Sequence, residues 1–463
     1  MKLLLLAIFT LTNGPFHVGY KVLNHYDYGR TTQPPVNFEG KKNEGERAIP
    51  IQISIWYPAE PGTGAKMRLQ DYVYVTRERN DLKPLTDEQK AQSLDVMRFP
   101  AKFGAGIDLT DDQIKSIYAQ TLLASKEAPA KSGRFPVIIA ASDGGPSNHP
   151  TLYEHLASLG YIVLFTPSIS RDATRQVNAP QQVIMDRINN VEYLLLYARS
   201  LPNADMERIG IMGVNFDGMT ALLYQMKSGE ARAVVSIDGW EGKSNGADIV
   251  QSSIYYNPLA FKVPYFTVQQ DDKMELSQNI FNALQYSDRY HFVLKNMNHS
   301  YLVTNLYSLP MIPAELKQSY NYLYSSIGKF FDASLKEKKF VVEPTQGIAK
   351  VEISKTALPP VPSSAELETM IMAGEFDKVK RIAAEALKNN PELKFIESSA
   401  LDLYNFRFSQ AKKPENCVAV RELGVLVFPG SADAWERLGD AQAAVNKTED
   451  ANKSYQQAKL LRK

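Results

Sequence analysis

The sequence predicts an α/β protein with a mostly parallel sheet, followed by a smaller all-helical domain. Three observations carry this prediction. Between residues 134 and 335, short uninterrupted apolar runs alternate with amphipathic stretches, as in parallel strands buried between helices. Residues 208–219 have the pattern of a buried strand, a sharp glycine-bracketed turn and a buried helix. From residue 364 the pattern is helical and repeats.

Length and composition set the class of protein. A chain of 463 residues exceeds one ordinary core, so we expect two or three domains. The hydrophobic fraction of 44% and the charged fraction of 22% are typical of globular proteins. A net charge of +1 favours neither nucleic acid nor a membrane surface as a partner. Cys417 is the single cysteine, which excludes an intramolecular disulfide and a cysteine-rich zinc site. We expect no metal and no cofactor.

The amino terminus favours export. Residues 1–13 combine a basic start with a short apolar run, which is typical of a signal peptide, although an Ala-x-Ala cleavage site is missing. The run is too short to span a bilayer, and no later segment is apolar enough to be transmembrane. We therefore expect a periplasmic or secreted protein, with a buried first strand in a cytoplasmic protein as the alternative.

The large domain is expected to span residues 14–335. Residues 14–57 alternate like strands. Residues 60–133 are polar, and we expect an insertion that lies over the sheet rather than a core element. Apolar strands and helices then alternate from residue 134, and a helix near 314–335 closes the domain.

A proline-containing segment, 336–363, is expected to be an extended linker before a helical domain at 364–463. The helical domain resembles tetratricopeptide repeats, and a generic helical bundle is the alternative. Its last unit carries the pattern of that repeat at Trp435, Leu438, Gly439, Ala451, Tyr455 and Ala458. The resemblance implies a module that binds a peptide or protein partner.

Residues 208–219 have the context of a nucleophile elbow, Gly-x-Ser-x-Gly, at the end of a strand. Asn215 occupies the serine position and Asp217 the position of the second glycine. The chain from residue 14 to 335 resembles the α/β-hydrolases, and specifically their platelet-activating-factor acetylhydrolase and dienelactone hydrolase-like branch. The segments that carry the resemblance are 14–19, 142–145, 213–218, 236–240 and 296–299.

The resemblance implies an acid and a base beside the elbow. Asp238 ends the strand after the elbow helix, so its carboxylate should emerge at the carboxyl edge of the sheet. A turn-capping role is the structural alternative for Asp238, and Asp271 and Asp272 are the alternative acid. His299 follows the last parallel strand. The order elbow, acid, histidine is that of the α/β-hydrolases, with Asn215 at the nucleophile position.

Asn215 removes the chemistry that the elbow normally supplies. Its carboxamide has no hydroxyl proton for a histidine to remove, and its nitrogen is a poor nucleophile. Losing the serine of a triad lowers turnover by a factor on the order of 10⁶. Asparagine tolerates positive φ, so it keeps the turn. We expect a catalytically impaired hydrolase homologue that binds a small ester or acyl ligand.

The oxyanion site also departs from the family pattern. The resemblance implies that the N–H groups of Gly145 and Phe216 would face a developing oxyanion. Asp143 and Asp217 flank this position and are expected to oppose negative charge there. We therefore expect Asp217→Gly to increase any activity that Asn215→Ser restores.

An active ester hydrolase with another nucleophile is the alternative. The candidates are an aspartate formed from Asn215, or Ser142 or Ser300 nearby.

Overall fold

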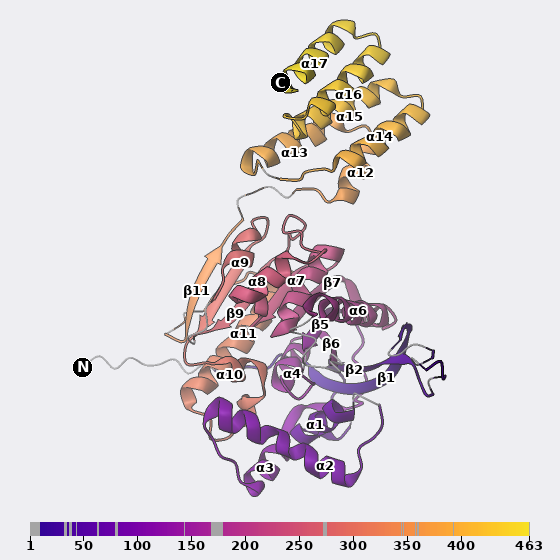
Figure 1. Cartoon of the computed structure of the whole chain (residues 1–463). Coiled ribbons are helices and arrows are strands. Elements are labelled where there is room, and N and C mark those ends of the chain that lie inside the picture. The colour runs from indigo at the N-terminus through magenta and orange to yellow at the C-terminus, as the bar shows by residue number, and fades with distance from the viewer. Residues whose placement is uncertain are drawn as a thin grey trace, which may run out of the picture. The chain divides into compact units, whose positions relative to one another are not determined.

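The chain forms two compact units that divide after Thr356 (Figure 1). The computed structural model describes residues 10–31, 35–36, 39–42, 44–62, 64–78, 82–142, 144–167, 179–271, 276–343, 345, 347–356, 358, 361–391 and 393–462. No helix within these ranges is long and apolar enough to cross a bilayer. The segment expected to be a signal peptide lies largely outside them.

The first unit is built on an 11-stranded sheet with the order β11-β10-β9-β8-β7-β5-β6-β2-β1-β4-β3. The strands are β1 (His17–Thr31), β2 (Ala48–Ala59), β3 (Lys66–Arg68), β4 (Thr121–Lys126), β5 (Phe135–Ser142), β6 (Ile162–Pro167), β7 (Ala204–Val214), β8 (Ala233–Ile237), β9 (Tyr265–Gln270), β10 (Arg289–Leu294) and β11 (Ala349–Ser354). The six central strands β6, β5, β7, β8, β9 and β10 are parallel, whereas β2 and β11 join them antiparallel. This is the mostly parallel sheet of an α/β-hydrolase fold.

Helices cover both faces of the sheet (Figure 1). One face carries α4 and α11, and the other carries α6, α7 and α8. The helices of this unit are α1 (Leu69–Glu78), α2 (Asp87–Ser93), η1 (Leu94–Met97), η2 (Pro100–Gly104), α3 (Asp111–Tyr118), α4 (Pro150–Ser158), α6 (Pro180–Arg199), α7 (Phe216–Ser228), η3 (Trp240–Gly242), α8 (Ser244–Gln251), α9 (Asn279–Ala283), α10 (His299–Val303), η4 (Leu306–Ser308) and α11 (Ala314–Lys336).

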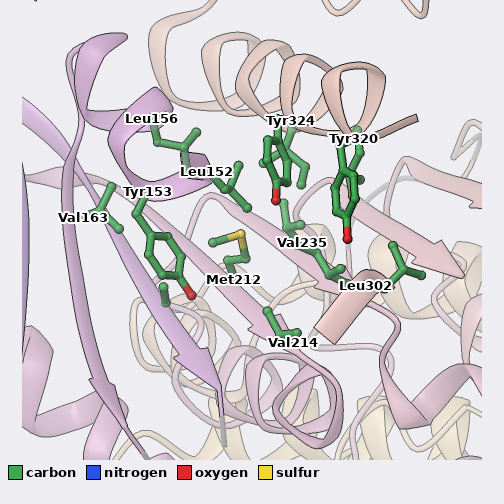
Figure 2. Packing of buried hydrophobic residues seen from close by; sticks show 14 of the residues in the cluster. Leu152, Tyr153, Leu156, Val163, Met212, Val214, Val235, Leu302, Tyr320 and Tyr324 are labelled. Atoms are coloured by element: carbon green, nitrogen blue, oxygen red, sulfur yellow. The ribbon is translucent and has the colours of Figure 1, made fainter. Parts of the chain in front are cut away.

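The uninterrupted apolar strands follow from this double covering. In β5 every residue is buried, with Ile138 in the cluster under α4 and α11 and Ile139 in the cluster under α6 and α7. Successive side chains of a strand point to opposite faces, so a strand covered on both faces must be apolar throughout. Figure 2 shows part of the first cluster, with the tyrosines of α11 and the side chains of α4 gathered over β7 and β8. The labelled residues are Leu152, Tyr153, Leu156, Val163, Met212, Val214, Val235, Leu302, Tyr320 and Tyr324.

The segment 60–133 differs from the expected overlying insertion, because part of it joins the sheet and the core. It supplies β4 and the edge strand β3, and Tyr72 of α1 is completely buried. The Tyr72 hydroxyl accepts a hydrogen bond of 2.9 Å from Trp56 Nε1 and donates one of 2.7 Å to Glu154 Oε1. Glu154 Oε2 accepts from the backbone N–H of Leu123 at 2.7 Å. Burial of these polar groups is possible because each has a partner.

The expected linker 336–363 also differs from the structure. Residues 349–354 form β11, which pairs antiparallel with β10 from Arg289↔Ser354 to Leu294↔Ala349. The prolines in this segment indicated a linker, although the segment contains β11, the strand at one edge of the sheet. The boundary of the first unit therefore lies at Thr356, about 20 residues beyond the predicted one.

The second unit is helical. Its helices are α12 (Ser364–Met372), α13 (Phe376–Asn389), α14 (Ser398–Gln410), α15 (Pro414–Val427), α16 (Ala432–Ala444) and α17 (Thr448–Leu461). Consecutive helices pack against each other along most of the unit. A Cβ atom on Gly439 would lie 2.6 Å from Cε1 of Tyr455, so α16 and α17 approach closely at this glycine.

Glu154 should make stability depend on pH. Burial raises its pKa to about 7 from 4.5, so between these values the native state holds a proton that the unfolded state releases. The free energy of unfolding should therefore fall as pH rises through this window, by at most about 1.4 kcal/mol per pH unit from this group. Urea unfolding at pH 5, 6 and 7 should show a smaller fall in Glu154→Gln than in the native protein. Exposed Glu207 provides the control variant Glu207→Gln. Equal slopes in native and Glu154→Gln protein would contradict the assignment.

The two units should also separate under proteolysis. Since β11 is held in the sheet, a nonspecific protease should cut between about 355 and 363 rather than anywhere from 336. Mass spectrometry of early fragments tests this expectation. Early cuts confined to 336–348 would show that β11 is not part of the folded unit.

Candidate active site

Asn215 lies in a tight turn between β7 and α7, with φ 58° and ψ −125°. A positive φ is rare for a non-glycine residue, and the neighbouring glycines show what enforces it. A Cβ on Gly213 would lie 2.0 Å from the carbonyl oxygen of Asp217, and one on Gly218 would lie 2.4 Å from Oγ of Ser236. The backbone N–H of Asn215 donates to the carbonyl of Ile237 at 2.9 Å. The turn is therefore a nucleophile elbow in its backbone geometry.

Trp240 fixes the Asn215 side chain. Its indole N–H donates to Asn215 Oδ1 at 2.8 Å, and its backbone N–H donates to the carbonyl of Asn215 at 3.3 Å. The Trp240 ring meets Phe216 edge to face at 5.4 Å between centroids. In the sequence, Trp240 is only the last residue of segment 236–240, one of the segments that resemble the α/β-hydrolases. Its donor role could not be derived, because it depends on how η3 folds back over the elbow.

Asp238 and His299 are brought together. His299 Nδ1 is hydrogen-bonded to Asp238 Oδ2, and Asp238 is buried while the His299 side chain is 41% exposed. Asp238 follows β8 with φ 49°, and its N–H donates to the carbonyl of Val268 at 2.7 Å. Because Nδ1 is engaged, Nε2 is the nitrogen left to face a ligand. The buried Lys243 ammonium lies 3.4 Å from the same Asp238 oxygen, a contact without a local sequence signal.

Asp271, one of the two alternative acids, lies near a lysine of β11. Asp271 Oδ1 lies 3.8 Å from Nζ of Lys350 in β11. Asp272 lies outside the described residues. Asp238 is therefore the carboxylate that the structure places on His299.

His299 begins α10, and Asn298 fixes that start. The Asn298 side chain accepts from the N–H of Tyr301 at 3.2 Å, as an N-cap does, and donates to the carbonyl of Gly104 at 2.9 Å. The second bond connects α10 to η2 of the 60–133 segment. The position of the histidine therefore depends on that segment.

The two expected oxyanion donors lie on different elements. Phe216 is the buried first residue of α7. Gly145 lies in the loop after β5, where a Cβ would be 2.1 Å from Oγ1 of Thr76. A side chain at position 145 would therefore displace α1 from the loop. Asp143, expected to flank this site, lies outside the described residues.

Asp217 does not act as the sequence analysis expects. It is fully buried, and its Oδ2 forms an ion pair of 2.8 Å with Nη1 of buried Arg187 on α6. The Arg187 guanidinium also lies 4.6 Å from the centre of the Phe216 ring. The carboxylate charge is thus compensated behind the elbow, and the expectation that it opposes an oxyanion is withdrawn.

A cavity of about 520 Å³ opens beside His299. Gly144, Gly145, Ser147 and Asn148 from the loop after β5 line it together with His299. Its apolar wall comes mostly from the 60–133 segment and includes Leu69, Val73, Val96, Met97, Phe99 and Val303. Among the residues described, no three His, Cys, Asp or Glu side chains are grouped as metal ligands.

The serines considered as alternative nucleophiles differ in access. Ser142 is buried, and its hydroxyl accepts from the N–H of Gly144 at 3.2 Å. Ser300 lines the cavity next to His299. Ser147, which the sequence analysis did not consider, lines it as well, with its hydroxyl 3.0 Å from that of Thr76.

The buried ion pair leads to a prediction about Asp217. Asp217→Gly removes one partner and leaves a buried guanidinium without its carboxylate, which typically costs about 3–5 kcal/mol. We therefore expect a lower free energy of unfolding in urea, and no gain in activity when this change is added to Asn215→Ser. Glu230→Gly, which removes an exposed carboxylate paired with Arg199, is the control and should cost less. An Asp217→Gly variant as stable as the native protein would refute the assigned role of the pair.

Comparison with known proteins gives a structural similarity at low sequence identity. The chain matches no family profile and no curated protein. A ferulic acid esterase from Streptomyces cinnamoneus is similar in structure, with a TM-score of 0.48 and 14% sequence identity, over 73% of this chain and 97% of that chain. The assignment of the α/β-hydrolase fold rests on the strand order and the elbow of this chain.

Proposed function

We propose that the first unit binds an acyl-type ligand in the cavity beside His299 and has lost the serine-dependent hydrolysis of esters. The observation that carries this proposal is the carboxamide of Asn215 at the elbow, with φ 58° and its Oδ1 accepting from Trp240. A hydroxyl is needed at this position for the histidine to generate an attacking oxygen. The 14–335 segment's resemblance to the acetylhydrolase and dienelactone hydrolase-like branch supports an ester or acyl compound as the ligand.

The surrounding geometry supports retention of binding. His299, the glycine loop at 144–145 and the apolar wall all border one cavity, and Asp238 is hydrogen-bonded to this histidine. Such a cavity, mostly apolar with a few convergent polar groups, is the usual form of a small-molecule site.

An active hydrolase with another nucleophile is the second candidate. The observation that favours it is that the hydroxyl-bearing residues Ser147 and Ser300 line the same cavity as His299. An aspartate formed from Asn215 would also supply a nucleophilic oxygen, because the Trp240 indole engages only Oδ1.

For the helical unit, the resemblance of 364–463 to tetratricopeptide repeats supports a role in binding a peptide or protein partner. The close approach of α16 and α17 at Gly439 agrees with that pattern. Export remains a prediction from the composition of residues 1–13.

Restoring the hydroxyl tests the proposal. We expect little hydrolysis of p-nitrophenyl acetate by the native protein and a gain of at least about tenfold in Asn215→Ser, because Asp238 and His299 are already paired. The gain should disappear when His299→Ala is added to Asn215→Ser. Steady-state kinetics of purified native, single and double variants provide the measurement.

The second candidate predicts a different result. Native hydrolysis that survives Asn215→Ala and disappears in His299→Ala would show that another nucleophile acts, and would defeat the proposed loss of activity.

A further inference from the structure

We propose that the cavity beside His299 selects ligands with an anionic carboxylate end, and that the Arg77 guanidinium recognises that end. This inference rests on the proposed function and specifies the ligand class of the same site. Neither the elbow nor the Asp238–His299 pair requires Arg77, so the observations that carry the inference are separate ones.

The first observation is the position of Arg77 on α1. Leu69, Val73, Thr76 and Arg77 all line the cavity, and their spacing places them along one face of the helix. The first two give this wall its apolar surface, and Arg77 adds a cation in the last turn. Thr76, its neighbour, contacts Ser147 and lies against Gly145. Arg77 is therefore adjacent in sequence to Thr76, the residue that contacts the loop of Gly145 and Ser147.

The second observation is the balance of charge. Arg77 and the ionisable His299 line the cavity, whereas none of the described residues that line it is Asp or Glu. Arg77 is exposed to solvent, and a cation beside apolar walls attracts an anion because such walls focus its field.

The third observation is that, among the described residues, Arg77 lacks the carboxylate partner that several other cations of the same segment have. Arg98 is paired with Asp95 and Asp111, and Lys102 is paired with Asp108. Within the part of the chain that the structure describes, Arg77 has no such carboxylate partner. Its planar fork of donors is suited to two parallel hydrogen bonds with a carboxylate.

These observations identify an occupant with an apolar body and a carboxylate. The apolar body would lie against residues such as Val73, Met97 and Val303, and the carboxylate against Arg77. A free acid meets this description, whereas its neutral ester or amide would leave the guanidinium without a partner.

Octanoate and octanamide provide a matched test, because they share shape and apolar length and differ in charge. Isothermal titration calorimetry with the full-length protein at low salt should show octanoate binding at least about tenfold more tightly than octanamide. Arg77→Gln should remove this preference and leave octanamide affinity unchanged. Arg232→Gln, which changes an exposed arginine that does not line the cavity, should retain the preference.

Three results would overturn the inference. Equal affinity for the two ligands would remove the charge selection while leaving the cavity a binding site. A preference that persists in Arg77→Gln would remove the assignment to Arg77. Absence of binding for both ligands would refute the inference together with the ligand-binding part of the proposed function, but not the loss of hydrolysis, which the kinetic experiment tests separately.

Discussion

The close approach of β7 to α7 at Asn215 is the constraint on which the site depends. Gly213 and Gly218 leave no space for a side chain, and the residue between strand and helix must adopt a positive φ. Serine or asparagine can occupy that position with a similar backbone, but only serine supplies a nucleophilic oxygen. The fold thus keeps an elbow whose geometry is independent of the chemistry that such an elbow usually performs.

Two polar contacts support the elbow. Buried Arg187 pairs with Asp217 in the first turn of α7, and partly buried Trp240 donates to the Asn215 carboxamide. Each contact connects elements that are distant in sequence. Asp238 and His299 remain paired beside this rigid centre, in an arrangement that could accept a proton if a hydroxyl were present. The 60–133 segment contributes most of the apolar wall of the cavity beside His299.

The central sheet could be predicted from the period of the apolar runs, and the site residues Asn215, Asp238 and His299 from the resemblance to the α/β-hydrolases and their order in the chain. The apolar runs indicated which strands are covered by helices on both faces. Polar residues that follow these strands were expected at the carboxyl edge of the sheet. Other features depend on tertiary contacts without a local signal. Arg187 lies 30 residues before its partner on a different helix, so Asp217 looked like an opposing charge. Nearby prolines made the segment that forms β11 look like a linker. The cavity wall comes mostly from a polar segment, 60–133, which is connected to the core by the hydrogen bond between Tyr72 and Glu154.

The central claim is that the site keeps its geometry and lacks a nucleophile. A fluorophosphonate probe, which reacts with activated hydroxyl groups, tests this claim by intact-mass analysis. The native protein should show no adduct after long incubation, and Asn215→Ser should show one adduct that peptide mapping assigns to position 215. An adduct on the native protein at Ser147, Ser300 or another residue of the cavity would contradict the claim.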